Sequence, residues 1–143
     1  MQTRMHRHNG FTIVELLIVI VVIAILAAIS IVAYNGIQNR SKDAKVSSEV
    51  SNVKKAIELY KIDNGFYPSI GNDDAGYSFS GLSVPLVPTY MASLPSDYGL
   101  YQYVRGPVAN NSYGILVRNL SKPNCKTGAN INAGWWGASV LSC

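Results

Sequence analysis

One carboxylate stands inside an otherwise apolar stretch near the start of the chain. Glu15 follows the junction Gly10-Phe11 and precedes an unbroken apolar run from Leu16 to Ile29. A carboxylate at the centre of a bilayer costs about 2.5 to 3.5 kcal/mol, and less near the membrane edge. A cationic partner would offset that cost, because opposite charges attract strongly where water is excluded. Glu15 is therefore the first candidate for a functional side chain.

Residues that commonly carry catalysis or bind metals are scarce beyond the first ten positions. Both histidines, His6 and His8, lie within those ten, so the rest of the chain has no histidine base and no histidine ligand for zinc. No nucleophile–base pair stands out, which disfavours an enzyme, and no cofactor is expected. Residues 72–74 and Asp97 supply oxygen atoms, but their spacing matches no complete calcium loop, so no metal site is predicted.

The charge of the chain gives no sign of an acidic partner. The formal net charge is +4, yet Arg4 and Arg7 contribute to it from the first ten residues. After residue 10, ten of the 12 Lys and Arg remain, against eight Asp and Glu. A nearly neutral remainder gives no electrostatic argument for nucleic-acid binding.

Two cysteines and two tryptophans mark the C-terminal segment. Cys125 and Cys143 form an even, widely spaced pair downstream of the apolar stretch, which predicts a disulfide in an oxidising compartment outside the cytoplasm. Trp135 and Trp136 lie between them. Neighbouring side chains of a strand point to opposite faces, so we expect one tryptophan to pack inward and the other to offer a surface contact.

The apolar stretch is predicted to be a helix that crosses a membrane. From Phe11 to Tyr34 only Thr12, Glu15 and Ser30 interrupt its apolar character. At 1.5 Å per residue it spans roughly 36 Å, more than a hydrocarbon core of about 30 Å. A secretory signal has a shorter apolar region of about 7–15 residues, so this segment is expected to be retained.

The helix is expected to continue over residues 35–64 as an amphipathic helix. Its apolar residues recur at spacings of four and three and so share one face: Val46, Val50, Val53, Ile57 and Tyr60. Gly65 permits a left-handed cap, and we therefore predict that the helix ends near Asn64.

The remainder predicts a small sheet. Residues 69–97 form a connecting loop with one helical turn over 87–93. Strands over 100–104 and 113–118 flank a turn-rich segment and predict an antiparallel hairpin, and a third strand is expected around 137–141. The fold class is therefore α+β: a long N-terminal helix, apolar in its first half and amphipathic in its second, packed on a small antiparallel sheet.

Gly10-Phe11-Thr12-Ile13-Val14-Glu15-Leu16-Leu17 closely resembles the processing and assembly motif of type IV pilins and the related pseudopilins. In that family a prepilin peptidase cuts after the glycine and methylates the new N-terminal residue. The resemblance implies cleavage between Gly10 and Phe11 and N-methylation of Phe11. It also implies that Glu15 is the assembly carboxylate, in an i, i+4 relation to the new ammonium group of its own chain and able to meet that of a neighbour.

The same resemblance implies the pilin fold and a division of the chain into four parts. These are a cleaved leader (1–10), a transmembrane or filament-core helix (11–34), its amphipathic continuation (35–64), and a globular head (65–143). The implied function is that of a structural subunit of a type IV pilus, a surface filament for adhesion, motility or DNA uptake. The precursor would lie in the cytoplasmic membrane before it joins an extracellular filament. Its partners would be copies of itself, the peptidase, the assembly machinery, and a surface or DNA ligand.

Two other readings remain open. A pseudopilin of a type II secretion-like or competence system is favoured by the segments 65–68 and 94–95, whereas the cysteine-closed C-terminus favours a pilin. A monomeric, single-pass, membrane-anchored binding domain would keep residues 1–10 and would not need Glu15.

Overall fold

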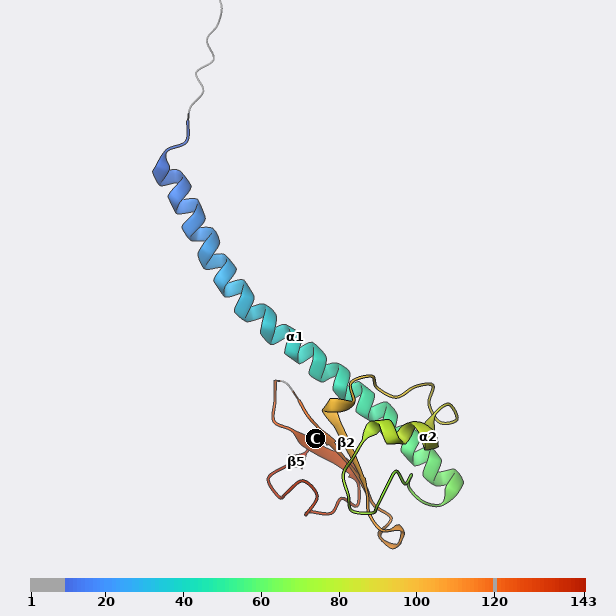
Figure 1. The fold of residues 1–143 in the computed structure, drawn as a ribbon. Coiled ribbons are helices and arrows are strands. Elements are labelled where there is room, and N and C mark those ends of the chain that lie inside the picture. The colour runs from blue at the N-terminus through green and yellow to red at the C-terminus, as the bar shows by residue number, and fades with distance from the viewer. Residues whose placement is uncertain (1–9, 120) are drawn as a thin grey trace, which may run out of the picture. The chain divides into compact units, whose positions relative to one another are not determined.

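The computed structural model describes residues 10–119 and 121–143, so of the predicted leader only Gly10 lies within the described residues (Figure 1). Its longest element is helix α1, which runs from Ile13 to Asn64. The chain divides between Gln38 and Asn39 into two compact units. The first contains the apolar part of α1, and the second contains the amphipathic part of α1 with everything that follows.

The amphipathic part of α1 buries the face that its sequence predicts. Val46, Val53 and Ile57 are at most 2% exposed, and Val50 is 6% exposed. The helix ends as predicted at Asn64. The next residue, Gly65, has φ +83° and donates its N–H to the carbonyl of Lys61 at 2.8 Å. This bond satisfies a carbonyl that would otherwise lack a partner in the last turn.

The sheet of the second unit has five strands in the order β1-β2-β3-β4-β5. The strands are β1 (Tyr77–Ser78), β2 (Tyr101–Arg105), β3 (Tyr113–Val117), β4 (Cys125–Ala129) and β5 (Leu141–Ser142). Neighbours pair antiparallel, except that β5 runs parallel to β4. The predicted α+β class, a long helix packed on a small and mostly antiparallel sheet, is confirmed.

The predicted hairpin is the pair β2–β3, in which Tyr103 lies opposite Ile115. Two other expectations are wrong. The helical turn expected over 87–93 lies earlier, where a 3₁₀ turn (Phe79–Leu82) leads into the short helix α2 (Ser83–Leu86). The third strand expected around 137–141 overlaps only the two-residue β5, and the strand beside β3 is β4.

The core lies between α1 and the face of the sheet that we call the inner face. Residues of β2 and β3 on this face pack against the buried face of α1: Tyr101, Tyr103, Tyr113, Ile115 and Val117. The 3₁₀ turn and α2 add Phe79, Leu82 and Leu86, each 0% exposed. Phe79 stacks on Tyr101 with ring centroids 4.8 Å apart. Aromatic side chains bury a large apolar area each, so they account for much of the stability of this small head.

Candidate functional site

Only Thr12 separates the Gly10-Phe11 junction from the first helical residue, Ile13. Both residues are exposed, and the Phe11 side chain is 88% exposed. Among the residues that the structure describes, no heavy atom beyond the chain neighbours of Gly10 lies within 4 Å of where a Cβ on this residue would be. The peptide bond between them therefore lies outside the helix, between two exposed residues.

Glu15 and Thr12 together close the N-terminal end of α1. The Glu15 carboxylate accepts hydrogen bonds from the Thr12 backbone N–H at 2.9 Å and from the Thr12 hydroxyl at 2.8 Å. The Glu15 N–H in turn donates to the Thr12 hydroxyl oxygen at 3.2 Å. This reciprocal arrangement is a capping box. It turns the carboxylate back toward Phe11, one residue before Thr12. The sequence analysis missed this role of Thr12, although the spacing Thr-x-x-Glu is its signal.

The apolar part of α1 exposes large apolar side chains. From Leu16 to Ile31, every Leu, Ile and Val side chain is between 48% and 63% exposed. Within α1 an 18-residue window reaches a mean hydropathy of 3.4, and none of it is buried within the chain. By length and composition the helix can cross a membrane. A surface of this kind requires lipid or other protein to cover it.

Residues 130–143, which we call the C-terminal strap, carry both tryptophans, whose rings lie against Gly114 of β3 on the face of the sheet opposite the inner face. They form a turn rather than the expected strand, because residues 133–136 are in turn conformation. Trp135 is 6% exposed, and a Cβ on Gly114 of β3 would lie 2.9 Å from its ring. Trp135 is therefore a core residue and not a surface contact, while Trp136 is half-buried.

Polar contacts hold the strap at several points. The Trp135 indole N–H donates to the Asp74 carboxylate at 3.0 Å, and the Trp136 indole N–H donates to Gln102 at 3.0 Å. Lys126 of β4 is 9% exposed, and its ammonium group lies 3.3 Å from the carbonyl oxygens of Trp135 and Gly137. These bonds satisfy polar groups that burial would otherwise penalise.

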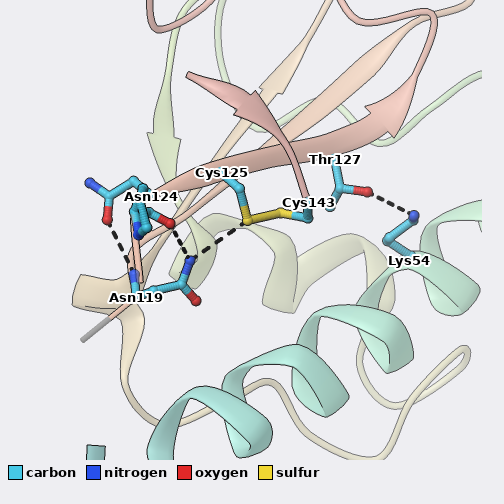
Figure 2. Close-up of a disulfide and its surroundings, with 7 residues drawn as sticks. Lys54, Asn119, Asn124, Cys125, Thr127 and Cys143 are labelled. Atoms are coloured by element: carbon cyan, nitrogen blue, oxygen red, sulfur yellow. Dashed lines mark hydrogen bonds between the residues drawn. A yellow bond between two sulfur atoms is a disulfide. The ribbon is translucent and has the colours of Figure 1, made fainter. Parts of the chain in front are cut away.

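A disulfide joins Cys125 of β4 to Cys143, with Cα atoms 4.9 Å apart (Figure 2). The Cys143 N–H also donates to the Lys126 carbonyl at 3.0 Å. Figure 2 shows that the disulfide lies on the side of the sheet where Lys54 of α1 reaches the Thr127 hydroxyl, at 2.9 Å. The end of the chain is thus fixed to the edge of the sheet.

The acidic residues at positions 73 and 74 have partners within the protein. Asp73 forms a short ion pair with Arg105 of β2, and Asp74 accepts from Trp135. Across residues 10–119 and 121–143, no group of three or more His, Cys, Asp and Glu is arranged to hold a metal ion. The loop is attached to the sheet and the strap through its own side chains.

Comparison with known proteins agrees with the N-terminal geometry. A family model described as the prokaryotic N-terminal methylation motif matches residues 5–31. The chain is 43% identical over 65 residues to the type IV wide pilus major component PilA4 of Thermus thermophilus, an alignment that covers 46% of this chain and 50% of that protein. It is 33% identical over 64 residues to the type II secretion system core protein G of Pectobacterium carotovorum, covering 45% and 41%.

One relative aligns over nearly its full length. The type II secretion system core protein G of Escherichia coli K12 is 26% identical over 139 residues, which is 93% of this chain and 94% of that protein. The chain otherwise spans about half or less of the length of the relatives named above. No solved structure matches significantly. In its methylation motif, its membrane-length helix and its α+β architecture, the chain is thus similar to members of the type IV pilin and pseudopilin family.

Proposed function

We propose that this protein is a structural subunit of a type IV pilus. The observation that carries the proposal is the open Gly10-Phe11 junction, followed directly by the Thr12–Glu15 capping box and a helix of membrane length. Members of the family are structural subunits that assemble into filaments with pilus or secretion machinery. For this chain we propose the four parts given above, with the leader at 1–10 and the head at 65–143.

The first step is processing. A prepilin peptidase hydrolyses the Gly10–Phe11 bond with one water molecule, leaving a carboxylate on Gly10 and an ammonium group on Phe11. Methylation then replaces one proton of the Phe11 amine with a methyl group from a methyl donor. The junction supports this step because it is exposed and lies outside the helix.

The second step is assembly, and Glu15 has the central role in it. The capping box directs its carboxylate to the Thr12 N–H, so the new ammonium group on Phe11 arises close to it. In the apolar interior of a filament, burial of a carboxylate without a cationic partner costs much more free energy than burial of one that pairs with an ammonium group. The pairing of Glu15 with the ammonium group of its own or a neighbouring subunit therefore favours one register of packing.

The apolar part of α1 then exchanges one apolar environment for another. Its exposed side chains leave lipid and pack against the same segment of other subunits. Contacts between different surfaces of identical copies form an open helical fibre when the rotation does not close. The precursor thus lies in the membrane, and the assembled filament lies outside the cell, where it meets a surface or a DNA ligand.

Substitutions at Glu15 separate its charge from its capping role. Glutamine can replace glutamate in a capping box, so Glu15→Gln keeps the cap and removes the charge, whereas Glu15→Ala removes both. We expect both variants to yield few filaments in shearing and electron microscopy, and Thr12→Ala to yield filaments close to wild type. Wild-type yield from Glu15→Gln would show that capping alone is needed and would refute the pairing mechanism.

Mass spectrometry of sheared filaments tests the proposal as a whole. We expect a chain that starts at N-methylated Phe11. A protein found only in membranes and still starting at Met1 would refute the pilus proposal and favour the monomeric membrane-anchored binding domain.

A pseudopilin is the second candidate, and the full-length alignment with core protein G of Escherichia coli favours it. Both candidates predict the same processing. Deletion distinguishes them: loss of surface filaments with normal protein secretion supports the pilus, and the reverse result supports the secretion system.

A further inference from the structure

A groove of about 800 Å³ opens between the amphipathic part of α1 and the inner face of the sheet near β4. One wall is α1, and the other is the end of β3, β4 and the disulfide, which Figure 2 shows opposite α1. The floor is apolar, with Val50, Val117 and the disulfide of Cys125 among its residues. Its volume lies within the range of specific binding sites, which is about 300 to 1,000 Å³.

The groove exists because α1 covers only part of the sheet. The buried face of α1 packs against β2 and β3, and on the β4 side of the groove the Lys54 ammonium group donates to the Thr127 hydroxyl. On the wall formed by α1, Ser47 and Ser51 are small and exposed. An incoming side chain can therefore approach the helix backbone closely.

The groove has more positive than negative charge. Lys54, Lys55 and Lys122 line it, against one acidic side chain, Glu58. The Glu58 carboxylate already accepts a hydrogen bond from the Tyr67 hydroxyl at 3.3 Å. The groove thus fits an occupant that is apolar and carries a carboxylate.

The end of α1 has these properties. Ile62 is 77% exposed, Phe66 is 40% exposed, and Asp63 between them is exposed as well. We propose that the groove receives the end of α1 from a second copy of this chain, with Ile62 and Phe66 on the apolar floor and Asp63 beside Lys55. Such a contact joins two different surfaces of identical subunits and therefore propagates along a fibre. The inference rests on the proposed function, since it assigns a contact within the filament.

A bulky residue in the groove tests whether it is an interface. In full-length protein in cells, Ser51→Trp fills the groove, while Asn52→Trp puts the same side chain on an exposed position of α1 that does not line it. We expect Ser51→Trp to lower the yield of sheared filaments about tenfold or more. An indole in the groove overpacks the contact between subunits, and the cost of overpacking corresponds to a loss of affinity of about that size. Asn52→Trp should stay within about twofold of wild type. Equal yields from both variants would overturn the proposal.

Charge exchange identifies the occupant. Lys55→Glu and Asp63→Lys should each lower filament yield, and the double variant should restore it. Because Asp63 also contacts the Tyr90 hydroxyl within its own chain, the melting temperature of each variant is measured in detergent micelles to exclude loss of folding. Failure of the double variant to recover, with folding intact, overturns the assignment to Asp63. An absence of filaments from the wild type would instead overturn the proposed function itself.

Discussion

Removal of the disulfide should lower the stability of the head without releasing the tryptophans. Cys125 and Cys143 are 18 residues apart, and a closed loop of this size stabilises a fold by about 3 kcal/mol through the entropy of the unfolded chain. We therefore expect the double variant Cys125→Ser/Cys143→Ser to lose about 3 kcal/mol of unfolding free energy. The midpoint of urea unfolding of the full chain in detergent micelles measures this loss.

The strap should nevertheless stay in place under native conditions. Trp135 is held by burial and by Asp74, and Trp136 by Gln102, and none of these contacts depends on the disulfide. Both tryptophans of the chain lie in the strap, so tryptophan fluorescence, excited at wavelengths where tyrosine does not absorb, reports on its docking. Without urea, the emission maximum of the double variant should equal that of the wild type.

Two results would refute this reasoning, and they refute different parts of it. A native emission shifted to that of exposed indole would show that the disulfide, and not the tryptophan contacts, holds the strap. An unchanged urea midpoint would show that loop entropy contributes little here. Gln102→Ala is a matched control, because it removes one strap contact and leaves the disulfide intact.

Three further predictions concern the head. Trp135→Ala should cost about 3 to 5 kcal/mol in urea unfolding, as expected for a large aromatic lost from a core; a loss below about 1 kcal/mol would contradict its burial. Alkaline pH should destabilise the protein, because burial raises the pKa of the core tyrosines Tyr101, Tyr103 and Tyr113 above the ordinary value. Nearby carboxylates raise the pKa further at two of them, Glu49 at Tyr101 and Glu58 at Tyr113. A tyrosine whose pKa is raised in the folded state stabilises the fold at pH values below its unfolded pKa of about 10. This stabilisation is lost as the pH rises through the folded-state pKa. A urea midpoint that rises from pH 9 to 11 would contradict this sign. Finally, since Asp73 and Asp74 have protein partners, we expect equal melting temperatures in calcium and in EDTA, and a clear calcium-dependent rise would contradict that account.

The elements with strong local patterns were predictable from sequence. The end of α1 follows from glycine at position 65, and its buried face follows from the spacing of four and three between apolar residues. The hairpin β2–β3 follows from two β-rich segments around a turn. In each case the signal lies within the segment itself, so no distant contact is needed to read it.

The elements that depend on distant contacts were not predictable. Strand β4 reads Cys-Lys-Thr-Gly-Ala, which has neither alternation nor β-branched enrichment. It is a strand because β3 pairs with it along five residues and because a strap carbonyl receives its buried lysine. The tryptophan turn was missed for the same reason. Its conformation is set by Asp74 and Gln102, which lie 61 and 34 residues away in sequence.

Some parts of the molecule are stabilised by contacts within the chain, and others have apolar surfaces that we expect neighbouring subunits to cover. The head is held together internally by the contacts of the strap, by the disulfide and by the Asp73–Arg105 pair. The apolar half of α1, its exposed end and the groove have no such cover within the described chain. Substitutions in the strap should therefore lower the urea midpoint of the isolated subunit. Substitutions at Ser51 or Glu15 should leave that midpoint nearly unchanged and lower filament yield. A strap variant that lost filaments at an unchanged urea midpoint would show that the strap itself is an assembly surface, and this division of the molecule would then be wrong.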